Sequence, residues 1–307
     1  MNTMLSEIKS IPEKAQHFLD TSHDYVLPVG VPYLGMGSSY FAPLAFKYMG
    51  IDIRPELASE FYNYQYQGQK IPAAVLLSQS GRSTEVLWCA PLVDSCTIIT
   101  NYSTSQLCQF PNVSTTILLS AGEEHYSSSK TYINTLVALF KGFGINVQSP
   151  LKLLSEKITE YEKQGRALAD SVFDLLAKNK VNGLYITGSG PHIATAMQAA
   201  LIMSESTKLN FNGLPMAQYD HGPKETAQNS VVIQILSKGK SYDRSRKLSS
   251  IVAAAGAHVF TVEEPDATEN ESILHTIIPF NFMAYYLAAK LQVGETFMVG
   301  GKVTEVN

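Results

Sequence analysis

Short apolar runs alternate with segments of helical periodicity along the first half of the chain. Strands are predicted in the apolar runs at residues 31–37, 51–57, 73–77, 97–100 and 115–119. Apolar residues at spacings of three and four predict helices after the first of these runs as far as Met49, at 83–90 and at 131–141. Such alternation predicts βαβ units and a parallel sheet, in which ligands bind beyond the carboxyl ends of the strands.

The second half of the chain repeats this pattern. Strands are predicted at residues 183–187, 231–236, 257–262 and 274–278, and helices from Pro191, at 247–255 and at 281–291. An amphipathic helix predicted from Leu151 to about Lys178 connects the two halves. The glycine-rich turn Gly188-Ser189-Gly190 follows its strand as Gly37-Ser38-Ser39 follows the first one, which indicates an internal duplication.

These elements divide the chain into an N-terminal helix, two α/β domains, a connecting helix and a tail. In that order along the chain, the expected boundaries are 1–28 for the helix, 29–150 for the first domain, 151–179 for the connection, 180–290 for the second domain and 291–307 for the tail. Pro12 marks either a kink or the true start of the N-terminal helix. Each domain is predicted to contain a doubly wound parallel sheet flanked by helices.

Composition narrows the class of protein. Of the 307 residues, 45% are hydrophobic and 16% are charged, which suits a globular chain of two domains and argues against disorder. The net charge is −4 and no long basic cluster is present, so no nucleic-acid partner is expected. Without a signal peptide or an apolar run of about 18 residues, the chain is predicted to be soluble and cytoplasmic, with no membrane partner.

The cysteines and histidines give no metal-binding pattern. Cys89, Cys96 and Cys108 form no CxxC pair and are predicted to be small core residues. The seven histidines include no His-x-x-x-His pair. Neither a metal nor another cofactor is therefore expected.

The segment Ser78-Gln79-Ser80-Gly81, together with Ser83, is the strongest candidate for a binding site. A predicted buried strand passes here into a helix through hydroxyl residues and a glycine. The N–H groups and dipole of a first helical turn favour an anion, and the side chains add donors. The same residues are also ordinary helix caps, and the segment is neither a P-loop nor a G-x-G-x-x-G motif. Since Ser39 also follows a predicted strand, both turns are expected to face one phosphate.

Four further side chains are candidates for the chemistry. Glu205 extends an apolar helical stripe, where desolvation would raise its pKa toward that of a general base, unless it simply reaches solvent at the helix end. His221 is followed by Gly222-Pro223, which would hold it in a fixed loop. Ser128 either caps its own helix or faces the ligand, and Lys302 follows two glycines in a tail that is otherwise prone to fraying.

Taken together, these motifs resemble the sugar isomerase (SIS) family, and within it the isomerase domain of glutamine–fructose-6-phosphate aminotransferases and the stand-alone glucosamine-6-phosphate deaminases. The segment at 78–83 is similar to the family's Ser-Gln-Ser-Gly-x-Thr loop, with serine in place of threonine. Gly37-Ser38-Ser39-Tyr40 resembles its Gly-Thr-Ser-Tyr turn, Ala58-Ser59-Glu60-Phe61 matches the same four residues there, and Ser128-Ser129-Lys130 resembles its Ser-Thr-Lys stretch. The resemblance, from about Gly30 onward, implies two tandem SIS subdomains, each with a flavodoxin-like parallel sheet.

The resemblance also implies roles for the candidate residues and a small-molecule sugar phosphate as the ligand. The implied phosphate ligands are Ser39, Ser78, Gln79, Ser80 and Ser83, and the implied sugar contact is Ser128. Glu205 takes the place of the isomerisation base, His221 that of the ring-opening histidine, and Lys302 that of the tail lysine. A homodimer is implied as well, in which the histidine acts within its own subunit or across the interface.

Three departures from the family bear on the reaction. The family's lysine three residues before the base is Ile202 here, the Arg-Asn of its tail is missing, and no counterpart of its glutaminase domain is seen, so ammonia production from glutamine is not expected. The first expectation is conversion of glucosamine 6-phosphate to fructose 6-phosphate and ammonia, or the reverse. The alternatives are cleavage of a 6-phosphorylated fructosamine, simple aldose–ketose isomerisation, and a sugar-phosphate sensor without catalysis.

Overall fold

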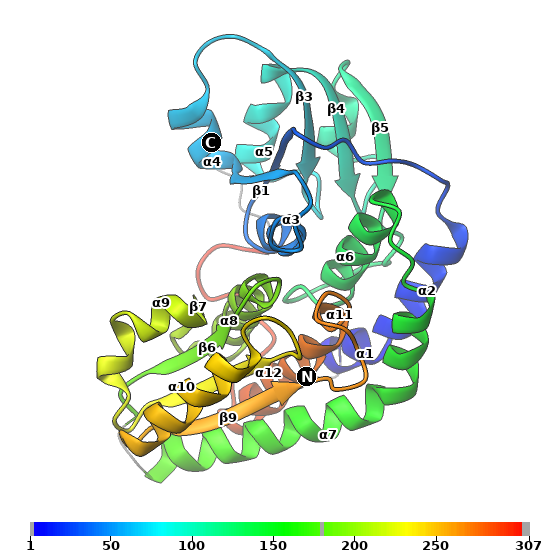
Figure 1. The fold of residues 1–307 in the computed structure, drawn as a ribbon. Helices are drawn as coiled ribbons and strands as arrows, with labels where there is room; N and C mark the ends of the chain where they lie inside the picture. Colours follow the sequence, from blue (N-terminus) through cyan, green and yellow to red (C-terminus); the bar gives the residue numbers. More distant parts are fainter. Residues whose placement is uncertain (1–2, 179–180, 303–307) are drawn as a thin grey trace. The chain divides into compact units, whose positions relative to one another are not determined.

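The computed structural model describes residues 3–178 and 181–302, which form two compact units (Figure 1). The first-half unit comprises residues 10–148 with the tail from 297, and the second-half unit comprises residues 149–296 with the N-terminal segment before Ser10. The expected N-terminal helix is two helices, α1 (Thr3–Lys9) and α2 (Ile11–Thr21), which belong to different units. Pro12 lies in the first turn of α2, so it marks a helix start.

The sheet of the first-half unit has the predicted parallel topology. Its strands are β1 (Pro32–Gly35), β2 (Arg54–Leu57), β3 (Ile71–Leu77), β4 (Val93–Thr100) and β5 (Val113–Leu118), hydrogen-bonded in the order β2-β1-β3-β4-β5. All four strand pairs are parallel. This is the flavodoxin-like order, with the reversal between β1 and β3. The predicted doubly wound sheet is therefore confirmed for this unit.

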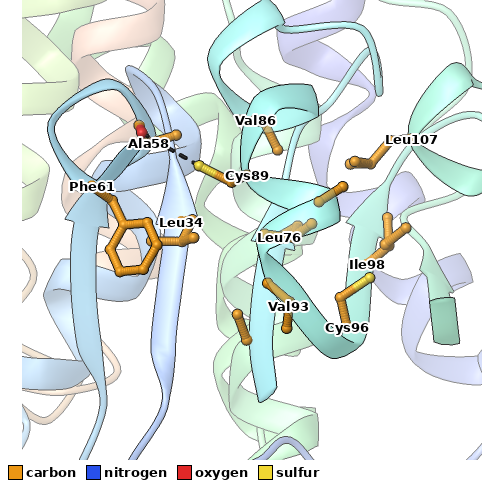
Figure 2. Packing of buried hydrophobic residues seen from close by; sticks show 12 residues of the cluster. Leu34, Ala58, Phe61, Leu76, Val86, Cys89, Val93, Cys96, Ile98 and Leu107 are labelled. Atoms are coloured by element: carbon orange, nitrogen blue, oxygen red, sulfur yellow. Dashed lines mark hydrogen bonds between the residues drawn. The ribbon is translucent and has the colours of Figure 1, made fainter. Parts of the chain in front are cut away.

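Alternating side chains of these strands pack against helices on both faces of the sheet. On one face, Leu34, Leu76 and Ile98 lie in a buried cluster with α5 (Thr84–Cys89), and the Cys89 thiol donates to the Ala58 carbonyl at 3.4 Å (Figure 2). On the other face, α3 (Ser38–Tyr48) and α6 (Lys130–Gly142) bring an aromatic pair together, with the rings of Phe46 and Phe140 4.8 Å apart.

Two of the three cysteines are core residues, as predicted. Cys89 and Cys96 are fully buried, and both belong to the cluster of Figure 2. Burial raises the pKa of the Cys89 thiol to about 12. These thiols are therefore protonated and serve as small apolar groups.

The second-half unit has a smaller sheet of the same kind. Its strands are β6 (Leu184–Gly188), β7 (Phe211–Pro215), β8 (Val231–Leu236) and β9 (His258–Glu263), all parallel and in the order β7-β6-β8-β9. The helices that accompany it include α7 (Gln148–Lys178), α8 (His192–Thr207), α9 (Met216–Asp220), α10 (Tyr242–Ala254) and α12 (Ile278–Lys290). The duplicated architecture is confirmed, and α7, expected as a connection, belongs to this unit.

Two strand predictions in the second half require correction. The strand predicted at residues 274–278 is wrong, because these residues form α11 (Ile273–Thr276) and the start of α12. A short apolar run that is buried on every side has no periodicity that separates strand from helix. Conversely, β7 was not predicted, because Gly213 and Pro215 lie within it; it is an edge strand, where both are tolerated.

Two buried histidines of the second-half unit predict acid sensitivity. His192 contacts the Ser272 hydroxyl at 2.9 Å through Nε2, and His275 contacts the Tyr161 hydroxyl at 3.0 Å through Nδ1. Burial lowers the pKa of each imidazole to about 4. The unfolded chain, with ordinary values near 6.5, therefore binds more protons below neutral pH. Stability is complete above about pH 6.5 and falls as the pH approaches 4.

We expect each of these histidines to lower the free energy of unfolding by about 2 kcal/mol on going from about pH 7 to about pH 5. Urea unfolding followed by circular dichroism at both pH values measures this loss. His275→Asn should reduce the loss, whereas His23→Gln, a change at an exposed histidine, serves as the control. If His275→Asn leaves the difference between the two pH values unchanged, the buried imidazole is not its cause.

Candidate active site

The Ser-Gln-Ser-Gly segment forms a compact turn between β3 and α5, held by its own hydroxyls. Ser78 and Ser83 face each other, with 3.1 Å between their Oγ atoms. The Gly81 N–H donates to Ser78 Oγ at 3.1 Å, and the Arg82 N–H donates to Ser80 Oγ at 3.2 Å. Ser78 is 2% exposed and Ser80 is 9% exposed. The predicted strand–turn–helix geometry is therefore present.

The loop after β4 stabilises this turn through backbone hydrogen bonds. The Asn101 N–H donates to the Gln79 carbonyl at 3.0 Å, and the Leu107 N–H donates to the Gly81 carbonyl at 3.0 Å. Gly81 has φ of +63°, and a Cβ at this position would overlap the side chain of Ser105. Both the backbone conformation and the close approach therefore require glycine.

Gly81→Ala is expected to lower the free energy of unfolding by about 2–4 kcal/mol, since left-handed strain adds to the overlap with Ser105. Gly68→Ala is the matched control: Gly68 has φ of +84° but nothing within 4 Å of the added Cβ. It should cost only about 1 kcal/mol. Urea unfolding of the two variants compares the costs directly. Equal losses would show that the contact with Ser105 does not constrain the turn.

A cavity of about 510 Å³ lies beside the turn, within the first-half unit. Its lining residues are Gln79, Ser80, Arg82, Tyr102, Thr104, Ser105, Glu123, Glu124, His125 and Lys302. The structure thus brings together three of the predicted site residues, namely Gln79, Ser80 and Lys302. Cationic and hydroxyl groups share this cavity with two carboxylates, so its lining carries hydrogen-bond donors and acceptors and charges of both signs.

Ser39 stands at the same edge of the sheet as the Ser-Gln-Ser-Gly turn. It lies in the first turn of α3, directly after β1, and is half-buried. Its N–H donates to the Met36 carbonyl at 3.0 Å. Because β1 and β3 are neighbouring parallel strands, both turns follow the carboxyl ends of adjacent strands.

The buried carboxylate of Glu124 also lines the cavity, although the sequence analysis did not identify Glu124 as a site residue. It follows β5 and is 3% exposed. Oε1 accepts from the Ser129 N–H at 2.9 Å, and Oε2 accepts from the Thr131 hydroxyl at 2.5 Å. The Thr131 Oγ1 also contacts Ser128 Oγ at 3.0 Å. The one sequence feature that could have identified Glu124 is its position just after a predicted strand, where ligands bind in parallel sheets.

Lys302 ends the described part of the tail, and residues 303–307 of the predicted tail lie outside the described residues. Its ammonium donates to the Glu124 carbonyl and lies 3.4 Å from Glu124 Oε2. Phe297, at the start of this segment, packs against Tyr126 with 4.9 Å between the centroids of the tilted rings. The tail up to Lys302 is therefore bound to the segment that follows β5.

The remaining candidates, Glu205 and His221, belong to the second-half unit. Glu205 is half-buried in the last turns of α8. The Lys208 ammonium donates to the Glu205 carbonyl at 2.5 Å and to the Thr296 carbonyl at 2.7 Å. Burial lowers the pKa of Lys208, and the charge of Glu205 opposes that shift. Ile202, one turn earlier on α8, is fully buried.

His221 caps the carboxyl end of α9 and is exposed. Its N–H donates to the Ala217 carbonyl at 3.2 Å, and Gly222 with Pro223 begins a 3₁₀ turn directly after it. The preceding Asp220 pairs with Lys224 at 2.9 Å and with Arg244 at 3.2 Å. The loop around His221 is therefore fixed by a helix end on one side and a proline turn on the other.

Within the described residues, no group of three or more histidine, cysteine, aspartate or glutamate side chains is placed to hold a metal ion. In the same part of the chain, no helix is both long and apolar enough to cross a membrane.

Comparison with known proteins identifies the fold. No protein-family model matches the chain. It is 30% identical over 300 residues to a glutamine–fructose-6-phosphate aminotransferase of Streptococcus mutans, covering 85% of this chain and 48% of that protein. The corresponding protein of Methanothermobacter thermautotrophicus is 25% identical over 324 residues, covering 94% of this chain and 54% of that protein. The chain thus spans about half the length of the curated relatives it matches.

Solved structures extend the likeness over both halves. The C-terminal domain of the Francisella tularensis glucosamine–fructose-6-phosphate aminotransferase has a TM-score of 0.81 at 18% identity, over 95% of this chain and 97% of that chain. The fold is that of the sugar isomerase (SIS) family. A Thermotoga maritima glucosamine-6-phosphate deaminase shares it with a TM-score of 0.79 and 18% identity, over 98% of this chain and 99% of that chain. Both halves of the SIS fold are therefore present, as the sequence predicted.

Proposed function

We propose that this SIS chain is an enzyme that moves a proton between C1 and C2 of a 6-phosphorylated amino sugar. The observation that carries the proposal is the Ser-Gln-Ser-Gly turn, open to a polar cavity that also contains Lys302. Its preferred reaction is conversion of glucosamine 6-phosphate to fructose 6-phosphate and ammonia, or the reverse. The names of the relatives support this class of substrate.

In this mechanism, the hydroxyls and amide of the first-half unit bind the 6-phosphate of the sugar. The proposed phosphate ligands are Ser39, Ser78, Gln79, Ser80 and Ser83, with Ser128 as a sugar contact. Binding of the phosphate also orients C1 and C2, the reacting carbons, which lie at the opposite end of the sugar. Lys302 would offset the negative charge that develops during proton transfer.

The chemical steps would fall to Glu205 and His221. His221 would assist opening of the sugar ring, after which Glu205 takes the C2 proton and an enolamine forms. Returning the proton to C1 gives the imine of fructose 6-phosphate, and water releases ammonia from it. A positioned base of this kind typically accelerates a reaction by about 10²–10⁴-fold.

Ile202 favours a second group of reactions over true amino transfer. It is fully buried on α8, one turn before Glu205, where it offers no amine for a Schiff base with a ketose. Cleavage of a 6-phosphorylated fructosamine and simple aldose–ketose isomerisation need only the base and the phosphate site. These two reactions are the alternative enzyme functions. The alternative that is not an enzyme is a sugar-phosphate sensor, which binds the ligand without catalysis.

A coupled assay separates these functions. The chain is incubated with glucosamine 6-phosphate, and ammonia and fructose 6-phosphate are measured together; fructoselysine 6-phosphate and glucose 6-phosphate are tested in parallel. Ammonia with fructose 6-phosphate in equal amounts supports the deaminase. Binding of all three sugars without any product would contradict an enzymatic role. A homodimer and a cytoplasmic location also belong to the proposal, and light scattering of the purified chain tests the dimer.

A further inference from the structure

One buried carboxylate connects two segments of the first-half unit that are 178 residues apart in the sequence. The Glu124 side chain has no exposed surface. One of its oxygens, Oε1, accepts from the Ser129 N–H at 2.9 Å, the Ser129 hydroxyl at 3.1 Å and the Thr131 N–H at 3.2 Å. These three donors belong to the start of α6, so this oxygen organises the segment that carries Ser128.

The other oxygen of Glu124 contacts both α6 and the tail, because Oε2 accepts from the Thr131 hydroxyl at 2.5 Å and also faces Lys302. Oε2 lies 3.4 Å from the Lys302 ammonium, which also donates to the Glu124 backbone carbonyl. The Lys302 side chain is only 23% exposed, so its charge is largely removed from water and depends on this partner. Lys302 and Glu124 both line the cavity beside Gln79 and Ser80.

We propose that Glu124 is a positioning residue that locks the C-terminal tail onto the start of α6 and thereby fixes Lys302 in the wall of the cavity. Oε1 accepts from the α6 segment, whereas Oε2 is shared by the Thr131 hydroxyl of α6 and the Lys302 ammonium of the tail. The contact itself is independent of any reaction. Its consequence for turnover rests on the proposed function.

The contact with the tail depends on the charge of Glu124, whereas the contacts with α6 are hydrogen bonds that a neutral amide can also make. Glu124→Gln retains an amide oxygen for the Ser129 N–H, the Ser129 hydroxyl and the Thr131 N–H, and its NH₂ can donate to the Thr131 hydroxyl oxygen. The substitution removes the charge that pairs with Lys302. The α6 segment should then stay in place while the tail is released. Glu123→Gln removes the same charge from the neighbouring, largely exposed carboxylate, whose side chain is 74% exposed, and is the matched control.

Trypsin reports on the tail directly, because cleavage after Lys302 requires its ammonium to leave Glu124. We expect Glu124→Gln to accelerate loss of the peptide that follows Lys302 by about 10-fold or more, measured by mass spectrometry of the intact chain. Glu123→Gln should cleave at the wild-type rate. Equal rates for Glu124→Gln and wild type would overturn the proposal.

Hydrogen exchange of the peptide covering residues 297–302 gives a second readout. It uses two different variants, so the test still works if one of them does not fold. Exchange there should rise in both Glu124→Gln and Lys302→Met, and combining the two changes should add nothing further. Additive effects would show that the residues do not act on the tail together. Trypsin cleavage and hydrogen exchange remain informative if the chain has no sugar-phosphate activity. Conversely, the activity assay remains informative if Glu124 does not hold the tail, so the two proposals can fail separately.

Discussion

Glu205→Gln is expected to lower kcat for sugar-phosphate turnover by about 10²–10⁴-fold, with binding of fructose 6-phosphate changed by no more than a few-fold. The amide has nearly the shape of the carboxylate but cannot accept and return a proton. The contact with Lys208 should survive, since it is made by the Glu205 backbone carbonyl. The loss should therefore appear in kcat rather than in affinity.

Glu160→Gln is the control for this experiment. It makes the same chemical change at an exposed glutamate of α7, in the same unit of the chain. Steady-state kinetics and calorimetric binding on both variants separate a chemical role from a general loss of charge. Full turnover by Glu205→Gln would mean that another residue acts as the base.

Ser80→Asp is expected to weaken binding of inorganic phosphate and fructose 6-phosphate by about 10²–10³-fold. Ser80 is 9% exposed and lines the cavity, so the new carboxylate would sit where an anion is proposed to bind. Two unit charges about 4 Å apart repel by about 4 kcal/mol near a protein surface. The helix dipole and loop donors would be satisfied by the carboxylate in place of the phosphate.

Ser80→Asn has the same shape as Ser80→Asp without the charge, and it should weaken binding by about 10-fold or less. Isothermal calorimetry of the two variants with the same phosphate compounds measures the electrostatic part of the loss. Similar affinities for the two variants would show that the anion binds elsewhere.

The sheets could be predicted because their strands are local, strongly apolar runs. Residues 231–236 are predicted and observed as β8, and the run at 73–77 lies within β3. Two elements of the second half were harder to predict from the sequence. The edge strand β7 contains a glycine and a proline, and the run at 274–278, which is buried on every side, is helical. Periodicity carries no information about such positions, since tertiary burial decides them.

The candidate site divides in the same way. The Ser-Gln-Ser-Gly turn was predictable because adjacent residues encode both its geometry and its donors, as the bond between Gly81 and Ser78 illustrates. Glu124 was not, because its partners lie both nearby in α6 and far along the chain at Lys302. No local pattern reveals which buried carboxylate will meet a distant ammonium.

Proton exchange tests the central claim most directly, because it does not depend on which nitrogen chemistry follows. The chain is incubated with fructose 6-phosphate in D₂O, and deuterium at C1 is followed by proton NMR. We predict rapid incorporation by the wild-type chain and incorporation slower by about 10²-fold or more with Glu205→Gln. Tight binding of fructose 6-phosphate without any deuterium at C1 would contradict proton transfer and would identify the chain as a sugar-phosphate sensor.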